Sequence, residues 1–180
     1  MLNYLFLFHY DFIIISMRIL GLDPGIAIVG YSIIDVDGDI INFSASGSIQ
    51  TSKNENDGKR LAEIAQDMEE IIKVYSPDVA AVEKLFFFKN QKTIIPVAQA
   101  RGVILMSLAK SNISYSEYTP IEVKQTITGF GRAEKAEVAQ AVELMVEKNG
   151  NNWPKLDDTI DSIAIAVCHA RHLQCSLYNV

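Results

Sequence analysis

The stretch Arg18-Ile19-Leu20-Gly21-Leu22-Asp23-Pro24-Gly25 decides the fold class of this chain of 180 residues. Its apolar run predicts a short buried strand over residues 18–23, and the turn-forming pair Pro24-Gly25 closes it. Asp23 stands at the end of that strand, where burying part of its charge is costly unless a positive or hydrogen-bonding group meets it. The acid is therefore a candidate functional residue, although a turn cap is the alternative.

Working outward, two more β-rich runs follow at residues 27–36 and 39–49, and Asp37-Gly38 between them is a strong hairpin signal. Apolar residues at helical spacing then predict an amphipathic helix that ends at Ser76-Pro77. A short apolar run after it, ending in Glu83, predicts a strand buried on both faces. Two strands thus end in a carboxylate.

The second half of the chain alternates predicted helices with one more strand. Residues 93–110 are apolar nearly all round, which predicts one face packed on the sheet and another on a partner subunit, with Pro96 in the first turn or at a kink. A fifth strand is predicted at 113–118, and three helices follow, over 119–129, over 133–148 and from 157 or 158 onward. This order predicts an α/β fold, a mixed five-stranded sheet flanked by helices.

Composition limits the chain to one domain with one core, because 49% of its residues are hydrophobic and 21% are charged. The net charge of −6 argues against a nucleic-acid binder, but residues 84–135 carry eight basic and three acidic side chains. This segment is therefore +5 and the remainder −11. Two cysteines fit a reducing compartment, which predicts a cytoplasmic location.

The first sixteen residues are mostly apolar, lack a basic start and are shorter than the ~20 residues of a spanning helix. Met17 stands directly before the first strand, so we expect it to be the natural start and the leader to be an upstream extension; a membrane-facing addition is the alternative. The expected organisation is an extension at 1–16, one domain at 17–175 and a tail at 176–180.

The last helix begins with a cluster of acids. Asp158 and Asp161 share one helical face, where two like charges repel unless a cation lies between them. Asp157 and Asp161 also share a face, so spacing alone does not choose, although Asp157 has a ready role as N-cap. If this helix meets the two strand ends, the result is an all-oxygen site that suits magnesium or manganese rather than zinc. Such a site predicts hydrolysis of a phosphodiester.

A smaller group, Cys168, His172 and Cys175, has helical spacing and is a candidate zinc site. With only three ligands close to the end of the sequence, two half-buried thiols and a surface histidine are the reading that we favour.

Six ordered blocks between residues 18 and 172 resemble the RuvC family of Holliday junction resolvases. The blocks are Leu20-Gly21-Leu22-Asp23-Pro24-Gly25, Val82-Glu83-Lys84-Leu85-Phe86, Gln99-Ala100-Arg101-Gly102, Val123-Lys124-Gln125-Thr126, Ala133-Glu134-Lys135 and Asp158-Thr159-Ile160-Asp161-Ser162-Ile163-Ala164-Ile165-Ala166. The resemblance implies a ribonuclease-H-like fold, a homodimer, and paired symmetric nicks across four-way junction DNA in recombination and repair. It also suggests the RuvA and RuvB branch-migration proteins as partners, and no membrane.

The resemblance further implies roles for single residues. It assigns Asp23, Glu83, Asp158 and Asp161 as ligands of two Mg²⁺ ions per active site, with Mn²⁺ as a substitute. It also places two catalytic lysines, Lys124 and Lys135, against phosphate near the scissile bond, and Phe86 against junction bases. The other predicted DNA contacts are basic residues of the same segment: Lys84, Lys89, Arg101 and Arg132.

The sequence departs from the pattern of the family at two places. Phe87 and Phe88 follow Phe86, so any of the three rings is a candidate for DNA contact. Pro96 falls in the helix that is expected at the dimer interface. The alternatives to a resolvase are a YqgF-type ribosomal RNA processing nuclease, which lacks the basic blocks at Lys124 and Lys135, and a non-catalytic junction-binding protein. An actin-like ATPase needs a duplicated domain, for which 180 residues leave no room.

Overall fold

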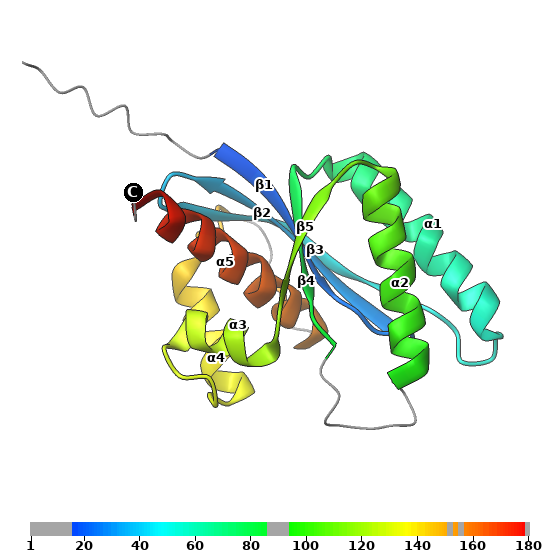
Figure 1. Cartoon of the computed structure of the whole chain (residues 1–180). Helices are drawn as coiled ribbons and strands as arrows, with labels where there is room; N and C mark the ends of the chain where they lie inside the picture. Colours follow the sequence, from blue (N-terminus) through cyan, green and yellow to red (C-terminus); the bar gives the residue numbers. More distant parts are fainter. Residues whose placement is uncertain (1–15, 86–93, 151–152, 155–156, 179–180) are drawn as a thin grey trace, which may run out of the picture.

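The computed structural model describes residues 16–85, 94–150, 153–154 and 157–178 (Figure 1). Five strands form one sheet in the order β3-β2-β1-β4-β5. They are β1 (Ser16–Asp23), β2 (Ile28–Asp37), β3 (Ile40–Gln50), β4 (Val79–Glu83) and β5 (Ser114–Tyr118). The first three pair antiparallel, while β4 lies parallel to β1 and β5 parallel to β4. The predicted mixed five-stranded sheet is confirmed.

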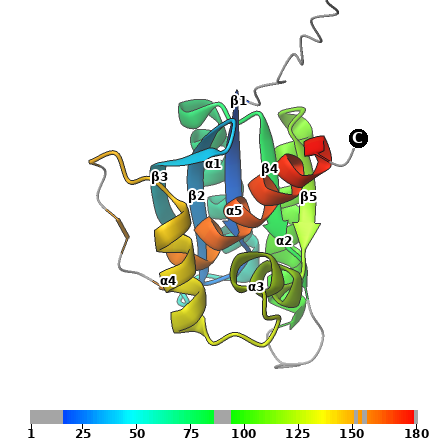
Figure 2. The same ribbon diagram turned by 90° about the vertical axis from the view of Figure 1, so that its left-hand side faces the viewer.

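Helices cover both faces of this sheet (Figures 1 and 2). One face carries α1 (Asp57–Tyr75) and α2 (Ile94–Lys110). The other carries α3 (Pro120–Thr128), α4 (Lys135–Met145) and α5 (Asp157–Tyr178), with α5 packed across β1 and β2. Each face has its own apolar core. None of the helices in the described ranges has the length and apolar character needed to cross a bilayer.

Local sequence signals account for the helix ends. Asn56 caps α1 by accepting from the Lys59 amide, and Thr119 forms the predicted capping box with Glu122 at the start of α3. Pro96 is the third residue of α2, so the first-turn alternative is the one that the structure adopts.

The helix predicted over residues 133–148 is shorter in the structure, where α4 begins at Lys135 and ends at Met145. Beyond it the chain turns back to the open edge of β3. The Glu147 amide donates to the Ile41 carbonyl at 2.8 Å, and the Phe43 amide donates to the Glu147 carbonyl at 2.8 Å. Pairing the exposed strand edge satisfies backbone groups that a longer helix would leave open to water.

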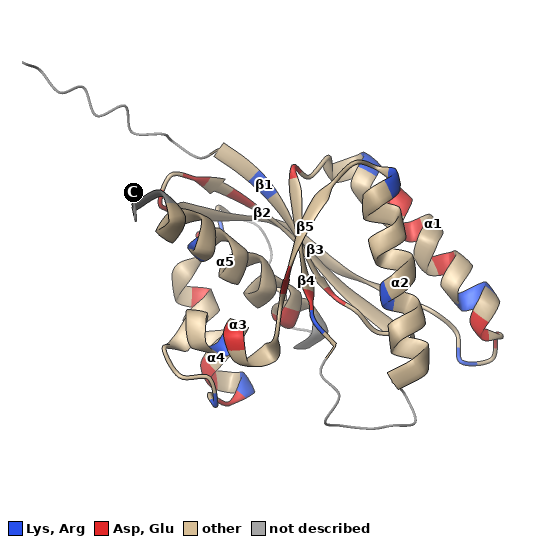
Figure 3. Cartoon of the chain, viewed as in Figure 1, with Lys and Arg blue, Asp and Glu red and all other residues tan. Residues whose placement is uncertain are grey.

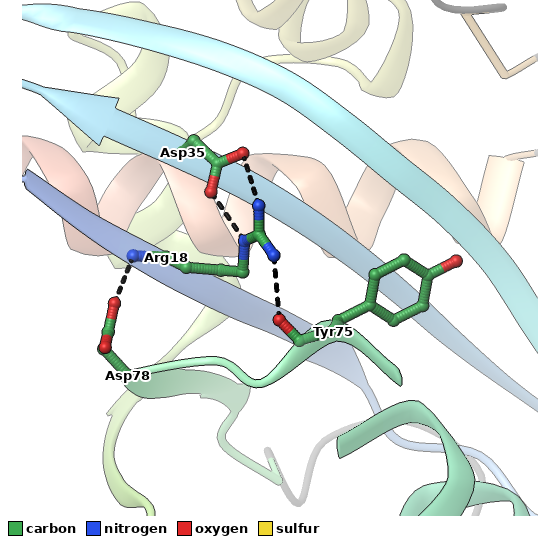
Figure 4. A network of polar contacts seen from close by, with 4 residues as sticks. All are labelled: Arg18, Asp35, Tyr75 and Asp78. Atoms are coloured by element: carbon green, nitrogen blue, oxygen red, sulfur yellow. Dashed lines mark hydrogen bonds and ion pairs between the residues drawn. The ribbon is translucent and has the colours of Figure 1, made fainter. Parts of the chain in front are cut away.

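A polar network holds the start of β1 (Figure 4). The Arg18 guanidinium donates to both Asp35 oxygens, at 2.7 and 3.1 Å, and to the Tyr75 carbonyl at 2.9 Å. The Arg18 amide donates to Asp78 at 2.7 Å. These bonds tie β1 to β2 and to the connection between α1 and β4, and so fix the register on which the opposite end of β1 depends.

Candidate active site

The two acids at strand ends lie side by side. In the parallel pairing of β1 with β4, Leu22 is opposite Val82, so Asp23 and Glu83 follow at the same edge of the sheet. Side chains alternate along a strand, and since Leu22 and Val82 both belong to the core beneath α1 and α2, the two acids face α5. The sheet thus delivers two carboxylates to one place.

Gly21 brings the last helix to those acids. A Cβ at this position would overlap the Ser162 carbonyl oxygen and lie 2.8 Å from the Ala166 Cβ, so α5 rests directly on the backbone of β1. Sequence reasoning missed this role, although a glycine inside an apolar strand is the signal of a close backbone approach. The contact sets Asp161, the residue before Ser162, beside the strand ends.

The surroundings of Glu83 shift the pKa of its carboxyl group. Burial, which is the largest cause, the charges of Asp23 and Asp161 and a hydrogen bond with Asp23 together raise the pKa of Glu83 to about 8, while Lys135 opposes them. Three carboxylates and one ammonium group are therefore close enough to act on one another. Such a cluster holds its charge only when cations or protons compensate it.

Two of the predicted lysines line the same cleft. The cleft has a volume of about 210 Å³, and its polar walls are Glu83, Lys124, Lys135 and Asp161. Figure 3 shows acidic residues at the start of α5 and basic residues on α3 and α4, on the same side of the sheet. Opposite charges thus face each other across a site large enough for a phosphate group.

Both lysines have defined partners. The Lys135 ammonium lies 2.8 Å from Asp161, with 52% of its side chain exposed. Lys124 donates to the Ala133 carbonyl at 2.5 Å, which ties α3 to the loop before α4. Lys124 is therefore held by the backbone of the loop, while Lys135 is held by an acid of the cleft itself.

Some predicted site residues fall outside the described residues. The backbone of Asp157 and Asp158 forms the first turn of α5, one turn before Asp161, but their side chains are not among those described. Phe86 and Lys89, with Phe87 and Phe88, belong to residues 86–93, which also lie outside.

The remaining predicted DNA contacts are spread over the molecule. Lys84 is exposed directly after β4, and Arg132 is exposed in the loop between α3 and α4. Arg101 differs, because its side chain is only 19% exposed and forms an ion pair with Glu117 on β5. The structure therefore places Lys84 and Arg132 near the cleft elements and holds Arg101 against the sheet.

A buried hydrogen bond fixes the far half of α5. Tyr118, opposite Glu83 in the β4–β5 pairing, has its hydroxyl 2.7 Å from Nδ1 of His169. Burial raises the pKa of Tyr118 to about 12 and lowers the pKa of His169, which favours the neutral pair. This contact joins α5 to β5 two turns beyond Asp161 and helps to position that acid.

The Cys168, His172 and Cys175 group does not make a metal site. Cys168 is buried, Cys175 is exposed, and the Cys168 sulfur lies 3.7 Å from the His172 ring. Among the residues that the structure describes, no three His, Cys, Asp or Glu side chains form a ready-made metal site, and this applies to Asp23, Glu83 and Asp161 as well, whose proposed fourth partner, Asp158, has a side chain outside the described ones. With one thiol buried and the other exposed, the structure gives no support to zinc at Cys168, His172 and Cys175.

The donor atoms of the acidic site are of the kind that a divalent metal ion prefers. The three described acids supply only carboxylate oxygens, which suits magnesium or manganese. Burial and, after it, the charges of Asp23 and Asp161 raise the pKa of Glu83, and a cation bound among the acids would oppose both effects. A fourth oxygen donor, at Asp158, is outside the described side chains but belongs to the adjoining helical turn.

Comparison with known sequences gives consistent matches. Residues 19–169 match the model of a family described as crossover junction endodeoxyribonuclease RuvC. A protein of that name from Petrotoga mobilis is 44% identical over 153 residues, covering 85% of this chain and 93% of its own length. Another, from Caldicellulosiruptor saccharolyticus, is 42% identical over 164 residues, covering 91% of this chain and 98% of its own length.

Solved structures agree with the sequence matches. The Thermus thermophilus RuvC structure superposes with a TM-score of 0.80 at 28% identity, over 89% of this chain and 97% of that one. The structure of T. thermophilus RuvC in complex with a Holliday junction substrate superposes with a TM-score of 0.81 at 28% identity, over 89% of this chain and 96% of that one. The yeast mitochondrial Holliday junction resolvase Ydc2, 15% identical with a TM-score of 0.66 over 91% of this chain and 83% of that one, shares the fold.

Proposed function

The chain belongs to the RuvC family of crossover junction endodeoxyribonucleases, and on this premise we propose how its own residues resolve four-way (Holliday) junction DNA. Its ribonuclease-H-like fold is that of the RuvC and Ydc2 structures. One observation carries the proposal: Glu83 and Asp161 share a cleft with Lys124 and Lys135, and Asp23 adjoins Glu83. The reaction is hydrolytic cleavage of a DNA phosphodiester, by paired symmetric nicks.

The acids are proposed as metal ligands. Family membership implies dependence on a divalent metal. We assign Asp23, Glu83, Asp158 and Asp161 as ligands of two Mg²⁺ ions, with Mn²⁺ as a working substitute. When bound, such ions activate a water and stabilise the leaving 3′ oxygen. The parallel strands hold the first two acids, and the close approach of α5 at Gly21 holds Asp161.

The lysines are proposed to receive the substrate. Lys135 balances the charge of Asp161 while the acids lack other cations, and its half-exposed side chain can turn to a phosphate once they are neutralised. Lys124 reaches the same cleft from α3. Both then stabilise negative charge that develops at the scissile phosphate.

The exposed basic residues around the cleft are proposed to extend the DNA-binding surface of the protein. Lys84, exposed directly after Glu83, and Arg132, exposed in the loop between α3 and α4, are proposed to meet phosphates of the DNA. Phe86 and Lys89 keep their proposed contacts with junction bases and phosphate. Arg101 would have to leave Glu117 to reach DNA, so we expect it to contribute least.

The assembly is also proposed. Two symmetric nicks need two sites, so we infer a homodimer through the outer face of α2. By family resemblance we propose that the dimer works in the cytoplasm with the RuvA and RuvB branch-migration proteins.

The deciding experiment compares a labelled four-way junction with a linear duplex of the same arm sequence, in magnesium and in EDTA. We expect nicks near the crossover of the junction only, and only with magnesium. Asp161→Asn is the catalytic control, which should bind the junction without nicking it. Equal cutting of duplex and junction would contradict the substrate assignment, and cutting in EDTA would contradict the metal assignment. Preferential cleavage of structured RNA would favour the ribosomal RNA processing alternative.

A further inference from the structure

The loop over residues 129–133, between α3 and α4, combines exposure with rigidity. Gly129 ends α3 with φ 75°, and the next residue, Phe130, leaves 60% of its surface open to solvent. A large apolar side chain in that position gains little from folding. Its ring is therefore available to something outside the fold.

Side chains of α3 lock the backbone of this loop. Gln125 binds both sides of Phe130, since its amide nitrogen donates to the Gly129 carbonyl at 2.8 Å and its amide oxygen accepts from the Gly131 amide at 3.0 Å. The Thr128 hydroxyl donates to the Lys124 carbonyl at 2.8 Å and accepts from the Phe130 amide at 3.1 Å. The ring is thus presented from a fixed backbone, which lowers the entropy lost when a partner binds.

The loop is also joined to the catalytic cleft. Lys124, which lines the cleft, donates a hydrogen bond from its ammonium group to the Ala133 carbonyl at 2.5 Å, and the Ala133 amide donates to the Phe130 carbonyl at 3.0 Å. Two residues later the chain reaches Lys135, the second basic wall. Two hydrogen bonds, through Ala133, therefore connect the backbone of Phe130 to Lys124, which is proposed to hold the scissile phosphate.

The local charges match a nucleic acid. Arg132 is exposed in the same loop, and Lys124 and Lys135 flank it along the chain, against the exposed carboxylate of Glu134. Basic residues that hold the backbone, interleaved with an aromatic ring that can stack on a base, are the combination that binds unpaired nucleotides.

Resting on the proposed resolvase function, we propose that Phe130 is a DNA-contacting residue of this protein, whose ring lies against an unstacked nucleotide of the junction beside the scissile phosphate. Arg132 holds the adjoining phosphate. The contact positions the strand in the cleft, so that its loss weakens productive binding more than it weakens the bond-breaking step.

Photo-crosslinking tests the contact directly. Four-way junctions carry 5-iodouracil at single positions on each side of the crossover and are irradiated with the full-length protein in calcium, which permits binding without nicking. We expect the wild type and Phe130→Tyr to crosslink at one of these positions through the loop peptide. Phe130→Leu, which keeps an apolar side chain but has no aromatic face, should lose that crosslink.

Nicking in magnesium supplies the second readout. Phe130→Leu should raise KM for the junction about tenfold, the effect of losing one stacked base, and change kcat much less. Phe130→Tyr should restore KM. The matched control is Leu144→Ala, which removes an apolar side chain that is 89% exposed at the other end of α4 and should match the wild type in both readouts.

The outcomes separate this inference from the function on which it rests. A wild type that binds and nicks the junction, together with a Phe130→Leu variant that crosslinks and nicks equally well, overturns the role of Phe130 alone. A wild type that neither binds nor nicks the junction overturns the resolvase function. An unchanged melting temperature in all three variants is expected, and a fall confined to Phe130→Leu would mean that the ring supports the fold and would also overturn the inference.

Discussion

At the scale of the residue, the site is a charge cluster built from groups that repel one another. Burial, together with the charges of Asp23 and Asp161, raises the pKa of Glu83 to about 8, and Lys135 offsets only part of this rise. A protein would lose stability by holding such a cluster without compensation. The arrangement would become favourable with a divalent cation bound, which is the physical reason for proposing the acids as ligands.

The first prediction uses the pH dependence of folding in EDTA. Between pH 4.5, the ordinary pKa, and pH 8, folded Glu83 keeps a proton that the unfolded chain has lost. The free energy of unfolding should therefore fall as pH rises through this window, with the stabilisation fully present only below it. Glu83→Gln has no proton to lose, so we expect it to melt about 5 °C above the wild type at pH 8.5 and close to it at pH 4.5.

Thermal denaturation of both proteins over this pH range measures the effect. Glu63→Gln, which neutralises an exposed glutamate on α1, is the control and should follow the wild type. Parallel pH profiles for the wild type and Glu83→Gln would contradict the assigned pKa.

The second prediction identifies the ligands on α5. Asn at Asp158 or at Asp161 keeps the shape of the side chain but removes a charge from the metal site, so nicking in magnesium should fall by about a hundredfold or more. Junction binding in calcium should persist, because it depends mainly on Lys and Arg contacts. Asp157→Asn should be mild, since Asn caps a helix about as well as Asp. Loss of nicking in Asp157→Asn but not in Asp158→Asn would shift the assignment by one residue.

At the scale of the element, the contact between α5 and β1 decides whether the acids meet. The two elements touch at Gly21, where a methyl group would collide with the Ser162 carbonyl and with the Ala166 side chain. The bond between Tyr118 and His169 anchors the same helix further along. Together these contacts fix both the height and the rotation of α5 over the sheet.

The third prediction is that Gly21→Ala pushes α5 away from the sheet. Overpacking of this kind costs about 1–3 kcal/mol, so the melting temperature should fall by about 5 °C. Nicking should fall further than stability explains, because Asp161 moves relative to Asp23 and Glu83. Calorimetry and junction cleavage below the melting temperature measure the two effects. Leu144→Ala, which shortens a side chain that is 89% exposed on α4, is the stability control. Full activity of Gly21→Ala would mean that α5 does not position the acid.

At the scale of the whole molecule, α2 leaves an apolar stripe uncovered within the described part of the chain. Its inner face buries Ala100, Ile104 and Leu108 against the sheet and α1. Ile95 and Met106, exposed by 67% and 49%, mark the outer face, and exposed Gly102 lies between them. A stripe with a glycine at its centre would allow close approach of a second helix, and the partner subunit expected there from the sequence stays a prediction.

The fourth prediction tests that interface. The monomer has open space at Gly102, so Gly102→Glu should fold normally, while its buried charge should prevent a second copy from packing there. Sedimentation at micromolar concentration should report a dimer for the wild type and a monomer for the variant, and paired nicking of one junction should be lost. A wild-type monomer, or a variant that remains dimeric, would contradict the proposed interface.

The sequence by itself determined the elements and the identity of most candidate groups. Turn pairs such as Asp37-Gly38, the capping box at Thr119 and the apolar periods act over a few residues, so their outcome can be predicted locally. The ordered motifs, from Asp23 to Asp161, also carried the family, which the comparisons confirmed. The assignment of ligands among the acids at the start of α5 stays a prediction.

Only the tertiary structure decided which of these groups meet. The order β3-β2-β1-β4-β5 sets Asp23 beside Glu83, and the approach at Gly21 adds Asp161, although 138 positions separate Asp23 and Asp161 in the chain. The early end of α4 and the pairing of Arg101 with Glu117 were likewise set by distant partners, an open strand edge and a carboxylate on β5. The reason is that local propensities are worth tenths of a kcal/mol per residue, whereas burial, edge pairing and buried charges are worth about 1–3 kcal/mol each and prevail where the two conflict.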